Sequence, residues 1–375
     1  MSGLKDQLVQ WANLAQDLAW SRFNVITKHA GAFGLTPADV DRWANPGEPS
    51  FVAHLVSDDA NLFLRRAIAG HTVAPWRPDS VAVSSVFIHQ KPKIDFGSGQ
   101  IEIGDLLLVR QHFITGNPLP QGSAFLLQAK TSSSPATGKL KGNEATQFKL
   151  YRDWPTFTFP AYPTWLPSGA PRWDFSGARD ADRTGTYGVV YPKELKYLTS
   201  VRRKVPFADD CAWGVGTRTH FGSRGGFGMV DASKLSLGAF MEGFISGQFG
   251  RPWSVHRPDH WSQFVLQIMA RATDEKWTFP IQRAQIHAKP RLQVSEPLKL
   301  SLAWATNSSN SGQLNSRDGL DSARAAGDWL RSTRDRDVGG PPPDDVLPVP
   351  PAPGGLSMVY IGTFGDRPLD GLPQG

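Results

Sequence analysis

The chain has one cysteine, Cys211, among its 375 residues, and this scarcity excludes two kinds of site. A disulfide framework requires pairs of cysteines, and a cysteine-rich zinc site requires several of them. The acidic neighbours Asp209 and Asp210 raise rather than lower a thiol pKa, so Cys211 is a poor candidate for a catalytic nucleophile. So few thiols fit a reducing compartment, and we expect a cytoplasmic protein.

Long apolar runs and nucleotide-binding motifs are also missing. No stretch of about eighteen apolar residues occurs, so the sequence predicts no transmembrane helix and no membrane partner. Residues 1–7 lack the basic region and apolar core of a secretory signal. The glycines of residues 214–216 and 221–228 follow neither the P-loop order nor the dinucleotide fingerprint, which argues against an NTPase or a dinucleotide enzyme.

Aromatic bulk and a mild positive charge are present instead. The chain contains 40 Lys and Arg against 34 Asp and Glu, a net charge of +6, with a pI near 9.4. Its 13 tryptophans and 21 phenylalanines supply ample material for a large core. The charge is compatible with a polyanionic partner such as nucleic acid, although many proteins without such a partner carry a similar excess.

Hydrophobic periodicity divides the chain into a helical beginning, a β-rich core and a less regular end. Apolar residues recur with a helical period over residues 4–27 and 51–69, and Pro37 lies in the first turn of another predicted helix. Five segments follow: a helical lead-in (1–75), a core (76–200), a mixed α/β elaboration (201–337), a proline-rich linker (338–355) and a terminal strand with its tail (356–375).

Two neighbouring apolar runs carry charged and polar residues in unusual places. Residues 101–109 and 124–130 are typical of central strands, and the glycines and prolines between them predict a hairpin. Asp105 lies within the first run. Gln128 and Lys130 end the second run on one face, because residues two apart in a strand point the same way. Carboxylates and lysines are seldom buried without a partner or a metal ion, so these positions indicate a site.

A hairpin that brings Asp105 beside Gln128 and Lys130 can support metal-dependent hydrolysis. Mg²⁺ prefers oxygen ligands and keeps several waters, so Asp105, the Gln128 amide oxygen and the Ala129 carbonyl oxygen can hold it. Lys130 can then orient the attacking water and offset phosphate charge. The alternative interpretation is structural, with an acid at a turn, a hydrogen-bonded core amide and a lysine whose head reaches water.

The pattern of Asp105 followed by Gln128-Ala129-Lys130 resembles the PD-(D/E)xK nuclease superfamily, in the Gln-x-Lys form of Mrr-like restriction endonucleases. The resemblance covers roughly residues 80–160. It implies an α/β fold with a restriction-endonuclease-like core sheet flanked by helices, an N-terminal helical lead-in and a C-terminal helical or irregular elaboration. It also implies Asp105 as the principal ligand of Mg²⁺ or Mn²⁺. Where the family often has Glu, this chain has Gln128, whose uncharged amide binds metal more weakly.

Several further residues are candidates for the same site or for contact with DNA. Glu102 can add negative charge if Gly104 bends the chain, because an extended strand would turn it to the opposite face. A predicted helix over residues 144–151 can present Gln147 or Lys149. The basic candidates for contact with the nucleic-acid backbone are Arg202, Arg203, Lys204 and Arg224. A solvated surface position is the alternative for each of these basic residues.

Two other features have two interpretations each. The aromatic and proline-rich residues 154–163 suit a base-stacking platform or, more commonly, packing over the core. The apolar strand at residues 356–362 must dock on the chain's own sheet or add to a partner's sheet, since a lone strand cannot bury itself.

These observations, together with the resemblance, predict a metal-dependent DNA endonuclease of restriction or anti-phage defence. Its substrate would be DNA and its cofactor Mg²⁺ or Mn²⁺, and a protein partner or a homo-oligomer is compatible with the terminal strand. Three alternatives stay open: a nuclease subunit active only within a defence assembly, a non-catalytic nucleic-acid-binding module with the same fold, and a structural interaction protein.

Overall fold

The computed structural model describes the following residues: 3–29, 36, 46–71, 76–86, 93–97, 99–114, 121–132, 145–159, 172–175, 184–195, 209–216, 235–254, 257, 259–274 and 357–365. Several predicted features lie outside them, namely the helix at Pro37, the glycine-rich stretch at 221–228, the proline-rich linker and the basic residues Arg202, Arg203, Lys204 and Arg224. Among the described helices, none has the length and apolar character needed to cross a membrane.

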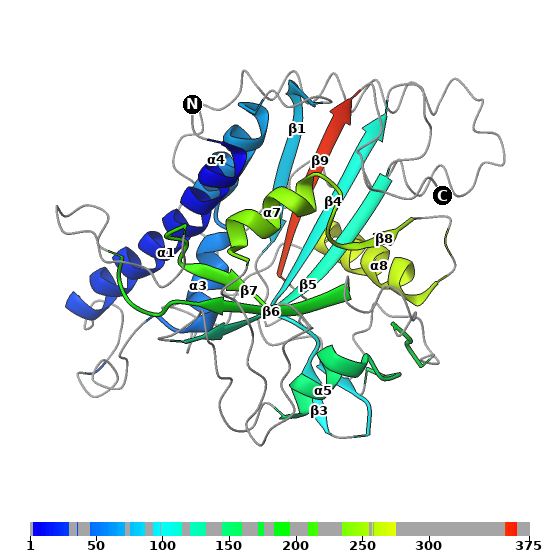
Figure 1. The fold of residues 1–375 in the computed structure, drawn as a ribbon. Coiled ribbons are helices and arrows are strands. Elements are labelled where there is room, and N and C mark those ends of the chain that lie inside the picture. The colour runs from blue at the N-terminus through cyan, green and yellow to red at the C-terminus, as the bar shows by residue number, and fades with distance from the viewer. Residues whose placement is uncertain are drawn as a thin grey trace.

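A mixed sheet forms the centre of the fold (Figure 1). Its strands lie in the order β1 (Trp76–Val86), β9 (Ser357–Gly365), β4 (Leu106–Ile114), β5 (Gln121–Thr131), β6 (Gly185–Val190) and β7 (Trp213–Val215), and β8 (Arg251–Trp253) pairs with β5. The β4–β5 hairpin is antiparallel, whereas β6 is parallel to β5 and β9 is parallel to β4. Most side chains of β4 and β5 are buried, as expected for central strands.

A small second sheet lies beside the end of the main one. Strands β2 (Lys93–Asp95) and β3 (Gln100–Glu102) form an antiparallel pair, and helix α5 (Ala145–Asp153) packs next to β3 (Figure 1). The backbone of Asp95 bridges to Thr158 just beyond α5, with two N–H···O bonds of 2.8 Å. The hairpin and the helix are therefore joined on one side of the sheet.

Four helices pack together over one face of the main sheet: α1 (Leu4–Lys28), α3 (Glu48–Leu55), α4 (Asp58–Ala69) and α7 (Leu237–Ile245). Phe240 of α7 meets Phe125 of β5, with ring centroids 4.8 Å apart. Gly238 allows α7 to touch α1, because a Cβ atom there would lie 2.5 Å from a methyl carbon of Val9. Burial of this apolar face is the main stabilising contribution of the helical lead-in.

Aromatic rings fill the opposite face, between the sheet, α5 and α8 (His260–Asp274). Tyr151 packs on Tyr187 of β6 with ring centroids 5.2 Å apart, and the contacts continue through Trp154 and Phe175 to Trp261 of α8. The described aromatics of the 154–163 stretch are at most 2% exposed, so the packing interpretation is confirmed for them: Trp154, Phe157 and Phe159.

Arg110 is buried in the middle of β4, which extends five residues beyond the apolar run of residues 101–109. Its guanidinium donates to the Ser123 hydroxyl at 3.1 Å and to the Ile245 carbonyl oxygen at 3.3 Å. Ile245 is the last residue of α7, where unpaired carbonyl groups concentrate negative charge. Burial lowers the pKa of Arg110 to about 9, and the helix end compensates the buried cation. Arg110 thus attaches α7 to the sheet.

The expected α/β fold, a strand-rich core flanked by helices, is confirmed at this level of detail. Two elements that the sequence predicts as continuous are each split into two in the structure. The helix over residues 51–69 breaks into α3 and α4 because Ser57 caps α4, accepting a bond from the Ala60 N–H at 3.2 Å. The strand over residues 101–109 breaks into β3 and β4. The terminal strand docks on the chain's own sheet, as one of its two interpretations expected.

Substitution of Gly185, at the start of β6, tests the close approach between the sheet and α5. A Cβ atom there would lie 2.7 Å from the Leu126 carbonyl oxygen and 3.0 Å from the Tyr151 ring. We expect Gly185→Ala to lower the free energy of unfolding by about 1–3 kcal/mol, measured by urea denaturation. Gly188→Ala is the control in the same strand, because its new methyl group would meet nothing closer than 3.6 Å. Equal stability of the two variants would contradict this packing.

Candidate active site

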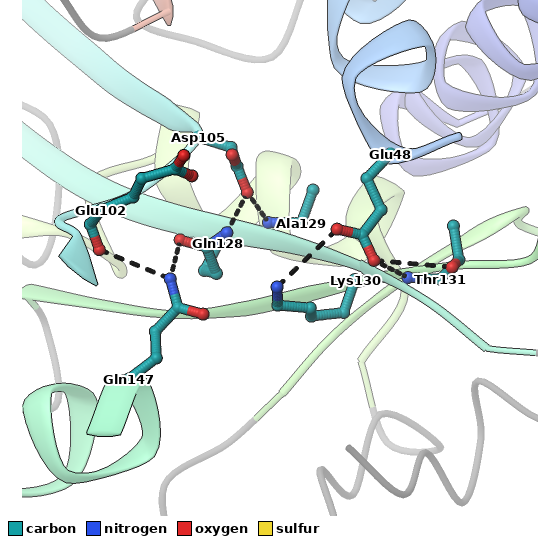
Figure 2. A network of polar contacts seen from close by, with 8 residues as sticks. All are labelled: Glu48, Glu102, Asp105, Gln128, Ala129, Lys130, Thr131 and Gln147. Carbon is teal, nitrogen blue, oxygen red and sulfur yellow. Dashed lines mark hydrogen bonds and ion pairs between the residues drawn. The ribbon is translucent and has the colours of Figure 1, made fainter. Parts of the chain in front are cut away.

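The open end of the β4–β5 hairpin brings Asp105 onto the Gln128-Ala129-Lys130 segment (Figure 2). The Asp105 N–H donates to the Leu127 carbonyl oxygen at 2.9 Å, so pairing of the two chains continues past β4. The Asp105 carboxylate accepts a hydrogen bond from the backbone N–H of Ala129 at 2.8 Å and another from the Gln128 amide. Asp105 therefore meets Gln128 and Ala129 of the predicted pattern, and Lys130 is the next residue along β5.

A second amide, Gln147, connects this contact to α5. Its Nε2 atom donates to the Gln128 amide oxygen and lies 3.4 Å from the Glu102 carbonyl oxygen. Gln128 is 2% exposed and Gln147 is 8% exposed, so the two amides form an enclosed chain that ends on Asp105. Reversal of both amides would break the contact of Gln147 with the Glu102 carbonyl oxygen, and it would require a proton or a cation at Asp105. In that orientation the Gln128 oxygen would face Asp105.

Glu102 also faces the site, because the chain bends between β3 and β4. Residues 103–105 belong to neither strand, and Gly104 lies in this break. The bend that would turn Glu102 toward the site is therefore present. Figure 2 shows the Glu102 carboxyl group beside that of Asp105. Tyr151 explains the glycine: its hydroxyl donates to the Ile103 carbonyl oxygen at 2.7 Å and would lie 3.1 Å from a Cβ atom on Gly104.

Glu48 is a site residue that the sequence reasoning missed. It occupies the first turn of α3 and accepts a bond from the Thr131 N–H at 2.9 Å. Its second oxygen lies 3.7 Å from the Lys130 ammonium group, so the candidate catalytic lysine is held by an ion pair (Figure 2). The sequence signal was an acid next to Pro49, since acids and prolines both favour the first turn of a helix.

Lys130 forms an ion pair with Glu48 and interacts electrostatically with the carboxyl groups of Glu102 and Asp105. Burial raises the pKa of Asp105 well above its ordinary value, and Glu102 raises it further, while Lys130 opposes the shift. Burial also raises the pKa of Glu102, against the positive charges of Lys130 and Lys93. The negative charge is larger than the lysine can neutralise, so the site favours an added proton or cation.

The donor atoms of this site suit a hard divalent cation. Asp105, the Gln128 amide and the Ala129 carbonyl group supply oxygen, which Mg²⁺ and Mn²⁺ prefer. Within the part of the chain that the structure describes, no three His, Cys, Asp or Glu side chains converge closely enough to form a ligand cluster by themselves. A cation would therefore rely on Asp105, neutral oxygens and water, which is how Mg²⁺ is commonly bound.

Other predicted residues lie away from these contacts. Lys149 is exposed on α5, two positions beyond Gln147 and therefore on a different side of the helix. Asp95 accepts a bond from the Gly97 N–H at 2.7 Å, as a hairpin acid. Cys211 is buried, and burial raises the pKa of its thiol to about 12, in agreement with its exclusion as a nucleophile.

Comparison of the chain with protein-family models, with curated proteins and with solved structures finds no match. Any function must therefore be inferred from the geometry around Asp105, Gln128 and Lys130.

The enclosed carboxyl group of Asp105 predicts a pH-dependent gain in stability for Asp105→Asn. Because the pKa of Asp105 is raised on folding, the folded protein binds the proton more tightly, and wild-type stability falls as pH rises above the ordinary value of 3.8. Asparagine can accept the same two bonds without the charge. We expect the melting temperature of the variant to exceed that of the wild type by an amount that grows between pH 4 and pH 8.

Asp95→Asn is the matched control, since its carboxyl group lies on the outer hairpin and bonds only locally. Scanning calorimetry at pH steps of about one unit measures both variants. A constant difference between Asp105→Asn and the wild type across the range would contradict an elevated pKa.

Proposed function

We propose that this protein is a metal-dependent endonuclease that hydrolyses phosphodiester bonds in DNA. One observation supports the proposal above the others: the half-buried carboxylate of Asp105, directly before β4, is hydrogen-bonded to the Gln128-Ala129 segment of β5, directly before Lys130. Hydrolysis of a phosphodiester requires a cation beside the phosphate, an oriented water and a positive charge near the developing negative charge. Restriction or anti-phage defence is the role that the resemblance to Mrr-like enzymes suggests.

Asp105 would be the principal ligand of Mg²⁺ or Mn²⁺, with the Ala129 carbonyl group and Gln128 as neutral ligands. When bound, the cation would supply Lewis-acid activation of the phosphate and lower the pKa of a coordinated water. The backbone N–H of Ala129 fixes the Asp105 carboxylate, so the ligand is oriented in advance. Glu102 would add negative charge beside Asp105 and strengthen attraction for the cation.

Lys130 would orient the attacking water and stabilise charge on the phosphate. Its side chain is 15% exposed, so the ammonium group is enclosed yet reachable from the side of Glu48, which is 33% exposed. Glu48 would act as a positioning residue, because its bonds to Thr131 fix its carboxylate and its ion pair fixes Lys130. Gln147 would position Gln128 in the same manner.

A non-catalytic nucleic-acid-binding module is the second candidate. The observation in its favour is the direct bond from the Gln128 amide nitrogen to Asp105, which occupies the carboxylate with a neutral donor. To hold a cation at Asp105, the protein would have to reverse the Gln128 and Gln147 amides. A nuclease that acts only in an assembly differs from both, because purified protein would cut DNA only after its partner is added.

Removal of Lys130 separates catalysis from binding. We expect Lys130→Ala to lower the rate of plasmid cleavage in Mg²⁺ or Mn²⁺ by about 10²–10³, because charge stabilisation at the phosphate is lost, while affinity for DNA is retained. Asp105→Ala should abolish metal-dependent cleavage. Lys28→Ala, which removes an exposed lysine at the end of α1, is the control and should cut like the wild type.

The measurement is single-turnover cleavage of linear and supercoiled DNA, with affinity determined separately by fluorescence anisotropy. Unchanged cleavage by Lys130→Ala would exclude this lysine as a catalytic residue. Binding without cleavage by the wild type in every metal would favour the binding module.

The amide at Gln128 allows the metal assignment to be tested directly. Gln128→Glu places a second carboxylate against Asp105, so we expect Mn²⁺ to bind roughly tenfold more tightly, since cation affinity rises with ligand charge. Without metal the variant should melt at a lower temperature, because a hydrogen bond is replaced by like-charge repulsion. Isothermal titration with Mn²⁺ and thermal unfolding measure the two effects. Gln10→Glu, at an exposed position of α1, is the control. Unaltered Mn²⁺ affinity in Gln128→Glu would count against a cation at Asp105.

A further inference from the structure

A cavity of about 400 Å³ lies between the N-terminal end of α1, the C-terminal end of α4 and helix α7. Apolar groups form most of its wall, among them Leu4 of α1, Ile68 of α4 and Ala239 of α7. Small-molecule sites of proteins commonly have volumes of about 300–1,000 Å³, with apolar walls and a few placed polar groups. The cavity is therefore large enough for a compact organic ligand.

The turn that ends α7 shapes one wall of the cavity. The Gln248 N–H donates to the Gly243 carbonyl oxygen at 2.8 Å, as in the Schellman motif of helix C-termini. Gly247 provides the left-handed residue of this motif, with a φ of 86°. The turn brings Phe249 back over the helix, where a Cβ atom on Gly243 would collide with its ring. An aromatic ring is thus fixed in place against the cavity.

Glu242 gives this wall a negative charge. No lysine or arginine accompanies it among the described residues that line the cavity. Its carboxylate is half-buried, and it forms neither a hydrogen bond nor an ion pair with any residue that the structure describes. A partly enclosed charge is stabilised by a partner of opposite sign. The Glu242 carboxylate is therefore available to a cation from outside the chain.

Two basic side chains near the cavity do not neutralise this charge. His71 lines the cavity, but its Nε2 atom accepts a bond from the Leu4 N–H at 3.2 Å, which requires the neutral form of the ring. Arg110 reaches the wall from the sheet and donates to the Ile245 carbonyl oxygen at 3.3 Å. The C-terminal end of α7 itself adds negative charge on this side. The cavity therefore favours a positively charged ligand over an anion.

The cavity is separate from the candidate active site. Ile245 in its wall binds Arg110 of β4, and Arg110 pairs with Ser123 of β5. Ser123 lies seven positions before Lys130 on that strand. Since each residue of a strand spans about 3.3 Å, these two positions are about 23 Å apart. Occupancy of the cavity can thus be measured without DNA, and absence of nuclease activity would leave the argument for it unchanged.

We propose that this cavity binds a small organic cation, with an ammonium group at Glu242 and a flat apolar body against Phe249. The ammonium group would donate a charge-assisted hydrogen bond to the carboxylate. Leu4, Ile68 and Ala239 would remove the apolar body from water. A neutral ligand of the same shape would lack the charge-assisted bond, and an anionic one would be repelled by Glu242. The ligand class is therefore a compact primary amine with an aromatic or aliphatic body.

Calorimetric titration of the full-length protein with tryptamine tests the proposal. Tryptophol, in which a hydroxyl group replaces the ammonium group, and indole-3-propionate are the neutral and anionic comparisons. We expect tryptamine to bind with a Kd of about 1 mM or below, at least tenfold more tightly than tryptophol, and indole-3-propionate not to bind. Absence of saturable tryptamine binding at ten times that concentration would overturn the proposal, and so would equal affinity for tryptamine and tryptophol.

Substitution of Glu242 tests the charged contact. Glu242→Gln keeps the size of the side chain and removes its charge, so we expect the affinity for tryptamine to fall about tenfold while the affinity for tryptophol is unchanged. Asp59→Asn, at an exposed position of α4, is the matched control and should bind tryptamine like the wild type. Wild-type affinity for tryptamine in Glu242→Gln would contradict a cation at this carboxylate.

A larger side chain at Ala239 tests the location of the ligand. The ring of Ala239→Phe would occupy part of the cavity, so we expect binding of both tryptamine and tryptophol to be lost while the thermal unfolding transition is retained. A folded Ala239→Phe variant that binds tryptamine like the wild type would place the ligand elsewhere and overturn the proposal. If this variant does not fold, the comparison of Glu242→Gln with the wild type decides the proposal by itself.

Discussion

Enclosure of the Asp105 carboxylate at the open end of the β4–β5 hairpin is the constraint on which the candidate site depends. A buried carboxylate is tolerated only when donors or positive charges surround it. Here the Ala129 N–H, the Gln128 amide and the nearby Lys130 provide that environment. Each of them is a neighbour in one short stretch of β5, so a single strand supplies most of the compensation.

The surrounding packing follows from that requirement. Gly104 permits Tyr151 to approach the chain just before Asp105, and the tyrosine hydroxyl satisfies the Ile103 carbonyl group. Burial raises the pKa of Asp105, and the negative charge of Glu102 raises it further. In the proposed reaction, a cation would take the place of the proton that the raised pKa of Asp105 favours.

Local sequence patterns predicted the parts of the site that lie close together in the chain. Two near-continuous apolar runs and the turn residues between them indicated the hairpin, and so the meeting of Asp105 with Gln128. Glu48 could not be predicted in this way, because its contact with Lys130 depends on how α3 packs against the end of β5. The predicted strand over residues 101–109 failed at Gly104 for a similar reason, since the bend is stabilised by Tyr151 from a distant helix.

The position of β9 within the sheet is the feature of the fold that the sequence predicted least well. Its apolar pattern predicted a strand, yet nothing local indicates insertion between β1 and β4 rather than addition at an edge. Contacts between segments so far apart form late, because loop closure loses entropy before pairing compensates for it. The hairpin that carries Asp105, Gln128 and Lys130 has no such delay. The residues of the site therefore lie on a local scaffold, and β9, the last of the described strands, pairs with this scaffold without supplying any of the contacts described for the site.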